Sequence, residues 1–248
     1  MKNRNILSML LLLWAGLQTA WAQQMVLRLK NNEVVKYSVE QVESITFEEE
    51  ELYEYVDLGL PSGTLWATCN VGATSPEEYG DYFAWGETQP KEDYSWSTYK
   101  YCEGTMNTMT KYCTRSNVGT LDNKTELEPM DDVATANWGV EWQMPSVEQL
   151  EELINSNYTT TTWTTLNGVY GWMIVSKQNG NRVFLPAAGY RYDTSLKGVG
   201  SGGRYWSRSL YTSNSSGGRG LYFDSSKVST GDYDRCDGRS VRPVRVQK

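Results

Sequence analysis

The sequence predicts a loop-rich α+β fold with two main helices and a small β segment at its N-terminus. Short β-branched and aromatic runs, separated by Gly, Pro, Asn and Ser, extend along most of the 248 residues, as is typical of short strands joined by turns. Only Asp131–Asn137 and Ser146–Asn155 have a convincing helical pattern. Two helices in a strand-rich chain with 10 Trp and 17 Tyr favour an α+β class in which aromatic side chains fill the core.

The first 22 residues have the pattern of an export signal. Lys2 and Arg4 precede the apolar run 6–17, and Ala20-Trp21-Ala22 fits the small-x-small cleavage rule. The run is too short for a membrane-spanning helix. We therefore expect residues 1–22 to be removed, Gln23 to begin the mature chain, an extracytoplasmic location (periplasmic, cell-surface or secreted), and no membrane insertion after cleavage.

Charge and composition exclude several classes of function. The net charge is −7 and no basic stretch occurs, so nucleic acid is not an expected partner. The chain contains no His, which removes Ser-His-Asp and Cys-His catalysis and every His-ligated metal site. Carboxylate-based catalysis and calcium, which needs only oxygen ligands, are left open.

Residues 23–52 are expected to form a small β segment followed by an acidic linker. Val26–Leu29 and Val34–Tyr37 flank the turn signal Asn31-Asn32, which predicts a hairpin. Residues 39–42 are expected to form a helical turn and residues 44–47 a third strand. The four successive acids at 48–51 are interpreted as a solvated linker.

The main domain is expected to cover residues 53–248. Residues 53–67 form two strands around the turn Pro61-Ser62-Gly63, and the loops that follow are anchored by Trp66 and Trp85. Further strands are expected at 159–166, 171–175 and 182–186.

The two helices carry different local signals. Ser146 with Gln149 forms a capping box, and Leu150, Leu153 and Ile154 share one face. Ahead of the first helix, Asp131-Asp132 fits either a helix N-terminus or a calcium site.

Four cysteines occur in a chain expected to be exported, where disulfides persist. The tripeptide Lys-Tyr-Cys occurs twice, ending at Cys102 and at Cys113, and a Cys102–Cys113 disulfide is the preferred pairing. Cys69 is expected to be buried and Cys236 to be exposed.

The stretch 202–239 has an unusual composition. Only six of its 38 residues fall outside Gly, Ser, Thr, Asn, Asp, Arg, Tyr and Cys: they are Trp206, Leu210, Leu221, Phe223, Lys227 and Val228. Tyr and Arg supply contact area while Ser, Gly and Asn supply adaptable hydrogen bonds, which suits a recognition surface. A polar, turn-rich β region with no partner has the same composition. The closing residues 240–244 are strand-like, and Pro243 favours an edge strand.

Seven motifs follow one another along the main domain: Val56–Ala67, Tyr82–Glu87, Ala134–Gly139, Trp142–Ser146, Leu185–Tyr190, Tyr205–Ser207 and Ser240–Val244. They resemble those of the FISUMP-type major paralogous domain, which is similar in turn to the formylglycine-generating-enzyme branch of the C-type lectin fold. The resemblance implies a lectin-like fold with paired N- and C-terminal strands and a long loop region that carries the binding face.

The stretch 202–239 is also similar to the mutated region of variable proteins from diversity-generating retroelements, whose altered asparagine codons yield the eight residue types that dominate here. The formylglycine-generating enzymes use a pair of cysteines in the C-terminal part of the domain. This chain has only Cys236 there, which argues against oxidase activity.

Together these patterns predict a non-catalytic binding protein, without a cofactor, that holds a protein or glycan ligand on one exposed face. Trp206, Leu221, Phe223 and Val228 are expected to support that face from beneath. Its residues are Arg204, Arg208, Tyr211, Ser213, Asn214, Arg219, Tyr222, Asp224, Asp232, Tyr233, Arg235 and Asp237. An extracellular glycan hydrolase that uses paired carboxylates, or a structural surface component, is the alternative.

Overall fold

The computed structural model describes residues 24–28, 33–43 and 53–246, and the chain divides into two compact units, 1–50 and 51–248. In the first unit, β1 (Gln24–Arg28) and β2 (Val34–Ser38) pair antiparallel, and a 3-10 turn, η1 (Val39–Gln41), follows. The predicted hairpin and helical turn are confirmed. The signal peptide 1–22, the third strand at 44–47 and the acidic run 48–51 lie outside the described residues.

The second unit begins and ends in one small sheet. Strands β3 (Tyr55–Asp57) and β4 (Thr64–Ala67) pair antiparallel around the predicted turn, where the Gly63 amide donates to the Leu60 carbonyl at 2.9 Å. Strand β13 (Val244–Val246) pairs with the other side of β4, so the sheet order is β13-β4-β3. Strand β13 begins directly after Pro243 and lies at the sheet edge, as expected.

A long irregular segment follows β4 and is held by buried aromatic side chains. Between residues 68 and 132 the described backbone forms loops, isolated bridges and the 3-10 turn η2 (Trp96–Thr98). The Tyr82 hydroxyl donates to the Ala188 carbonyl at 2.5 Å, and the Tyr99 hydroxyl donates to the Trp85 carbonyl at 2.7 Å. Each of these tyrosines packs its ring in the core and donates a hydrogen bond to a buried carbonyl. They therefore fix the loops in place, as backbone hydrogen bonds between strands fix a sheet.

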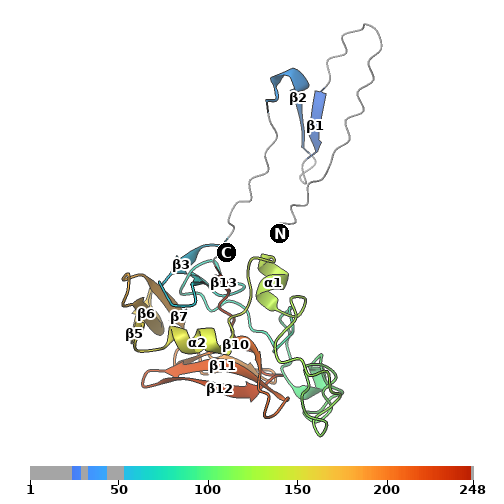
Figure 1. The fold of residues 1–248 in the computed structure, drawn as a ribbon, viewed down its shortest axis with the longest axis vertical. Coiled ribbons are helices and arrows are strands. Elements are labelled where there is room, and N and C mark those ends of the chain that lie inside the picture. The colour runs from blue at the N-terminus through green and yellow to red at the C-terminus, as the bar shows by residue number, and fades with distance from the viewer. Residues whose placement is uncertain (1–23, 29–32, 44–52, 247–248) are drawn as a thin grey trace. The chain divides into compact units, whose positions relative to one another are not determined.

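Two short helices, α1 (Val133–Trp138) and α2 (Val147–Leu153), occur where the sequence predicts them. Asp132 is the N-cap of α1, and its carboxylate accepts from the amides of Ala134 and Thr135. The capping box of Ser146 and Gln149 is present at α2. Helix α2 lies across the three-stranded sheet formed within residues 202–234 (Figure 1).

The other strands form antiparallel hairpins and meanders. Strands β5 (Thr159–Leu166), β6 (Val169–Ser176) and β7 (Arg182–Pro186) make one sheet, and β8 (Tyr190–Tyr192) pairs with β9 (Ser195–Lys197). Asn167 and Gly168, both with positive φ, form the tight turn from β5 to β6. The last sheet has the order β10 (Gly202–Leu210), β11 (Gly217–Asp224), β12 (Val228–Asp234). The fold is therefore mostly β with two short helices and many loops.

The sheet β10-β11-β12 separates two hydrophobic clusters. Leu221 and Phe223 belong to the cluster beneath α2, together with Leu150 and Leu153. Trp206 faces the opposite cluster, which is built from the aromatic residues of the loops. Side chains alternate between the faces of a strand, so one sheet serves both clusters.

Within the described residues, no helix has both the length and the apolar character required to cross a membrane.

Replacement of Trp206 by Ala should lower the free energy of unfolding by about 3–5 kcal/mol. The indole has no exposed area, and its N–H donates to the Phe83 carbonyl at 2.8 Å. Urea denaturation measures the loss. Val140→Ala is the control, since Val140 is 89% exposed and exposed changes usually stay within about 0.5 kcal/mol. A Trp206→Ala loss as small as that of the control would contradict this packing.

Candidate functional site

The sheet β10-β11-β12 distributes the predicted recognition residues over its two faces. Arg204 lies opposite Tyr222, and Gly218 lies opposite Tyr233. Directly paired residues share a face, and Tyr222 and Gly218 are an even number of residues apart, so Arg204, Tyr222 and Tyr233 lie on the same face. Leu221 and Phe223 are buried on the opposite face, where Val228 is half-buried, in agreement with their predicted supporting role. Trp206 pairs with Gly220 and is buried on the same face as Arg204, so its predicted position beneath that face is wrong.

Arg219 lies on the other face, which α2 covers. Its guanidinium is 3.4 Å from the Glu151 carboxylate of α2. Arg208 does not contribute to the face of Arg204 either, because its Nε donates to Glu126 at 2.8 Å and its Nη1 donates to the Met144 carbonyl. The prediction of one continuous face is therefore wrong for these two arginines, which join the sheet to neighbouring segments. It is also wrong for Asp232, which pairs with Arg219 and lies on the same face as Arg219.

The remaining exposed candidates lie in turns. Tyr211 is half-buried, and Ser213 and Asn214 are exposed in the turn between β10 and β11. Asp224 closes the next turn by accepting from the amides of Ser226 and Lys227, and it also accepts from the Tyr222 hydroxyl at 2.5 Å. Hydrogen bonds from Ser226 and Tyr222 hold the pKa of Asp224 well below its usual range.

Arg235 and Asp237 were expected at the surface, and both are buried. The Arg235 side chain donates to the Tyr99 hydroxyl at 2.7 Å and to the carbonyls of Ser215 (2.9 Å), Tyr112 (3.2 Å) and Lys111 (3.1 Å). The prediction of an exposed Arg235 is wrong because three of these four acceptors come from a segment more than 100 residues away in sequence. Arg235 is a core residue that fastens those loops.

The predicted Cys102–Cys113 disulfide is not formed, and all four cysteines are free thiols. The Cys102 thiol donates to the Trp96 carbonyl and the Cys113 thiol to the Arg115 carbonyl, both at 3.1 Å, so each sulfur belongs to a different turn. Cys69 is buried as expected. Cys236 is buried too, contrary to expectation, and burial raises its pKa far above the usual range of a thiol.

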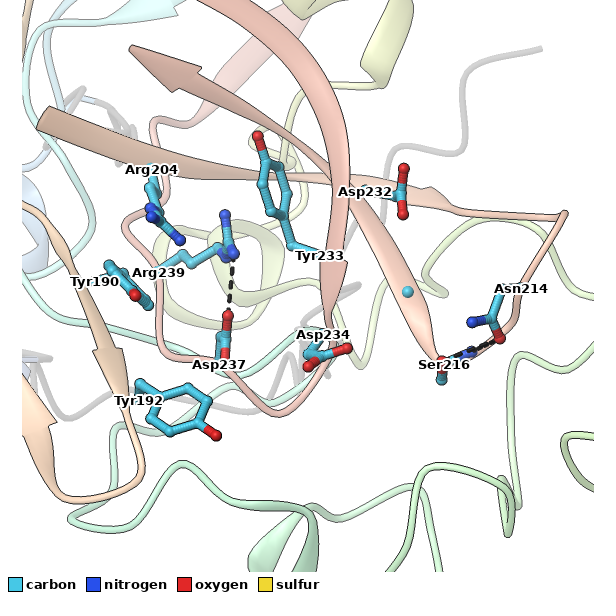
Figure 2. Close-up of a pocket in the computed structure, with 11 residues that line it drawn as sticks. Tyr190, Tyr192, Arg204, Asn214, Ser216, Asp232, Tyr233, Asp234, Asp237 and Arg239 are labelled. Carbon is cyan, nitrogen blue, oxygen red and sulfur yellow. Dashed lines mark hydrogen bonds and ion pairs between the residues drawn. The ribbon is translucent and has the colours of Figure 1, made fainter. Parts of the chain in front are cut away.

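An open pocket of about 340 Å³ lies beside the edge strand β12. Five of the twelve predicted residues line it: Arg204, Asn214, Asp232, Tyr233 and Asp237. Asp232 and Tyr233 come from opposite faces of β12, so the pocket extends around the edge of the sheet. Figure 2 shows Arg204 and Arg239 at one side of the pocket and Asn214 and Asp232 at the other.

Six further residues complete the pocket and were not predicted from the sequence. They are Tyr190, Tyr192, Ser216, Gly217, Asp234 and Arg239. Tyr190 and Tyr192 come from β8, outside the stretch with the unusual composition, and Arg239 follows the last predicted site residue. The Tyr-Arg-Tyr triplet at 190–192 is the only local sequence signal that could have indicated that Tyr190 and Tyr192 line the pocket.

One ion pair forms the floor of the pocket. Arg239 Nη2 donates to Asp237 Oδ2 at 3.0 Å, and both side chains are buried. Burial lowers the pKa of Arg239 to about 10, with the Asp237 carboxylate opposing that shift. Burial also raises the pKa of Asp237, again against the effect of its partner. In both groups burial shifts the pKa towards the neutral form, and the attraction between the partners opposes that shift.

The two carboxylates considered as calcium ligands both accept hydrogen bonds from other groups of the protein. Asp132 caps α1 as expected. Asp131 accepts from Lys111 Nζ at 2.5 Å, from the Tyr112 hydroxyl at 2.6 Å and from the Tyr101 hydroxyl. In the part of the chain that the structure describes, no three His, Cys, Asp or Glu side chains gather as a metal site.

Comparison with known proteins finds no family model, no curated protein and no solved structure that matches this chain.

Replacement of Arg235 by Ala should destabilise the second unit by about 3 kcal/mol or more. Truncation leaves several buried carbonyls without a donor, and each such group costs about 1–3 kcal/mol. Thermal or urea unfolding measures the effect, with Arg219→Ala as the half-exposed control. If Arg235→Ala unfolds like the wild type, the packing described for this side chain is wrong.

Asp131→Asn should lower stability at neutral pH by about 1–3 kcal/mol, and the difference from wild type should shrink in acid. Burial alone would raise the pKa of Asp131, but hydrogen bonds from Lys111, Tyr101 and Tyr112 outweigh it and lower the pKa. A lowered folded-state pKa contributes stability above the unfolded value of about 3.9, and this stability is lost as pH falls towards the folded value.

Urea unfolding of both proteins from pH 7 to pH 3 measures this difference. Glu103→Gln, at an exposed position, is the control. A difference that grows towards low pH would contradict the assignment.

Proposed function

We propose that this chain is an exported, non-catalytic binding protein that holds a protein or glycan ligand in the pocket beside β12. The observation that carries the proposal is the convergence of five predicted recognition residues on that pocket. Arg204 and Tyr233 reach it from β10 and β12, while Asn214 reaches it from the intervening turn. Small-molecule sites are concave and contain a few polar groups that converge, which is the arrangement here.

Within this proposal the second unit has the C-type-lectin-like fold of the FISUMP-type major paralogous domain. The pairing of β13 with β4, which joins the two ends of the unit, supports it. The long loop region at 68–132 and the position of the pocket in the C-terminal sheet support it further.

The similarity to diversified variable proteins concerns the accessible positions within 202–239. Arg204, Asn214 and Asp232 are accessible and line the pocket, whereas the buried Arg235 supports the fold. A neighbouring template repeat in the DNA that matches the coding region except at adenines would establish diversification.

A carboxylate-based hydrolase is the second candidate, because Asp237 has a raised pKa and lines the pocket. Perturbed carboxyl groups in a pocket are frequent in active sites. Turnover of any glycan by the purified protein would replace the binding proposal with this one.

Arg204→Ala should weaken the binding of a ligand by about 1–2 kcal/mol. Arg204 is half-buried, lines the pocket and is stacked on Tyr190, with its Cζ 3.6 Å from the ring centre. A glycan array and a displayed peptide library supply candidate ligands, and calorimetry measures the affinity of each variant.

Arg219→Ala is the matched control, because Arg219 is also a half-buried arginine of this sheet but contacts α2. Its effect should stay within about 0.5 kcal/mol. If Arg219→Ala abolishes binding of a ligand and Arg204→Ala does not, the binding site lies on the other face of the sheet.

A further inference from the structure

Three arginines near the end of the second unit are almost completely buried: Arg235, Arg239 and Arg242. A buried guanidinium is costly unless its N–H groups find acceptors. Arg242 finds four, donating to the Asn70 amide oxygen and to the carbonyls of Ala67, Thr68 and Phe184. Arg235 is bound in the same way by carbonyls and the Tyr99 hydroxyl. These two side chains are committed to the fold.

Arg239 is the exception, and it is the one that lines the pocket. Its Nη2 donates to Asp237, while Nε and Nη1 have no hydrogen-bond partner among the described residues. The second carboxylate oxygen of Asp237, Oδ1, is also buried without a partner. Buried polar groups are nearly always hydrogen-bonded, so two donors and one acceptor left unpaired in one ion pair indicate a missing group.

Aromatic rings hold the pocket arginines by their faces. The Arg239 Cζ lies 3.7 Å from the centre of the Tyr233 ring and 4.6 Å from that of Trp206. Arg204 is held likewise, 3.6 Å from Tyr190 and 5.5 Å from Tyr222. Stacking contacts the face of a guanidinium and does not use the N–H groups at its edge.

We infer that the pocket binds a neutral polyhydroxylated ligand, a sugar residue that places adjacent hydroxyl groups on Arg204, Arg239 and Asp237. This inference rests on the proposed function and specifies its ligand. A hydroxyl group donates one hydrogen bond and accepts two, so adjacent hydroxyls satisfy the arginine donors and the carboxylate acceptor together.

Charged ligands fit the pocket less well. An anion would pair with the two arginines but would meet Asp232, Asp234 and Asp237, which line the same pocket. An ammonium group would be attracted by the carboxylates but repelled by the positive charges of Arg204 and Arg239. Hydroxyl groups avoid both repulsions.

The unpaired atoms of Arg239 and Asp237 are buried, so a neighbouring group must move before a ligand can reach them. Tyr233 has the ring nearest to the Arg239 guanidinium, is half-buried, and lies on the edge strand β12. Binding is therefore coupled to a movement of the Tyr233 ring.

The test uses the full mature chain with the methyl pyranosides of glucose, galactose, mannose and fucose, together with deoxy analogues that each lack one ring hydroxyl. Calorimetry should detect binding of at least one neutral glycoside. Removing one hydroxyl of the adjacent pair from that glycoside should weaken binding tenfold or more. Arg204→Ala and Asp237→Asn should do the same, while Arg219→Ala should change the affinity less than twofold.

If Asp237→Asn fails to fold, Tyr192→Phe replaces it, since it removes only the hydroxyl of an exposed side chain at the pocket. A loss of affinity with Tyr192→Phe, together with Arg204→Ala, then supports the inference. Neutral-sugar binding that is unchanged by these variants overturns it.

Binding only to inorganic phosphate, sulfated sugars or carboxylated sugars overturns the neutral class of ligand. Binding only to peptides from a displayed library overturns the inference but leaves the proposed binding function standing. If the protein binds no ligand from any of these sources, both the inference and the proposed binding function are overturned.

Discussion

The second unit depends on guanidinium groups that are buried without carboxylate partners. Arg235 and Arg242 lie at either end of the segment that follows β12. Arg235 donates to carbonyls of the distant loop at 111–112, and Arg242 donates to the carbonyls of Ala67 and Thr68, where β4 ends, and of Phe184 in β7. A loop-rich fold leaves many backbone carbonyls outside regular ladders, and each needs a donor when it is buried. The planar fork of arginine supplies up to five donors from one side chain. These two residues therefore make it possible to bury the loops that surround the sheet.

The sheet β10-β11-β12 can present a pocket because of this support. Its α2 face is covered, and the cluster around Trp206 and Trp85 fills part of the opposite face. The indole of Trp85 packs so closely on Gly218 that a Cβ there would lie 2.7 Å from the ring. What remains open is the region around β12, where Arg239 shares the buried setting of Arg235 and Arg242 but not their hydrogen bonds. Structural support and the proposed recognition thus use the same residue type, and they differ in whether the N–H groups have hydrogen-bond partners within the protein.

Much of the fold could be predicted from the sequence because its signals are local. The capping box of Ser146 and Gln149 fixes the start of α2, and the alternation of Leu221 and Phe223 with Tyr222 fixes which side of β11 is buried. The candidate site was harder, because charge was taken as a sign of exposure. Arg235 is charged and buried, since its acceptors come from loops that no local pattern connects to it. Tyr190 was missed because it lies outside the stretch with the unusual composition, and Arg239 because it follows the last predicted site residue. The spacing of Cys102 and Cys113 indicated proximity, yet hydrogen bonds direct their thiols to separate carbonyls.

The most direct measurement of the central claim is NMR of the arginine side chains, in which the Nε–H signals of individual arginines are followed during titration with the neutral methyl pyranosides. The account predicts that the signals of Arg204 and Arg239 shift when a glycoside binds, while those of Arg235 and Arg242, whose hydrogen bonds belong to the fold, stay in place. Shifts confined to Arg208 and Arg219, or binding that leaves Arg204 and Arg239 unchanged, would contradict it.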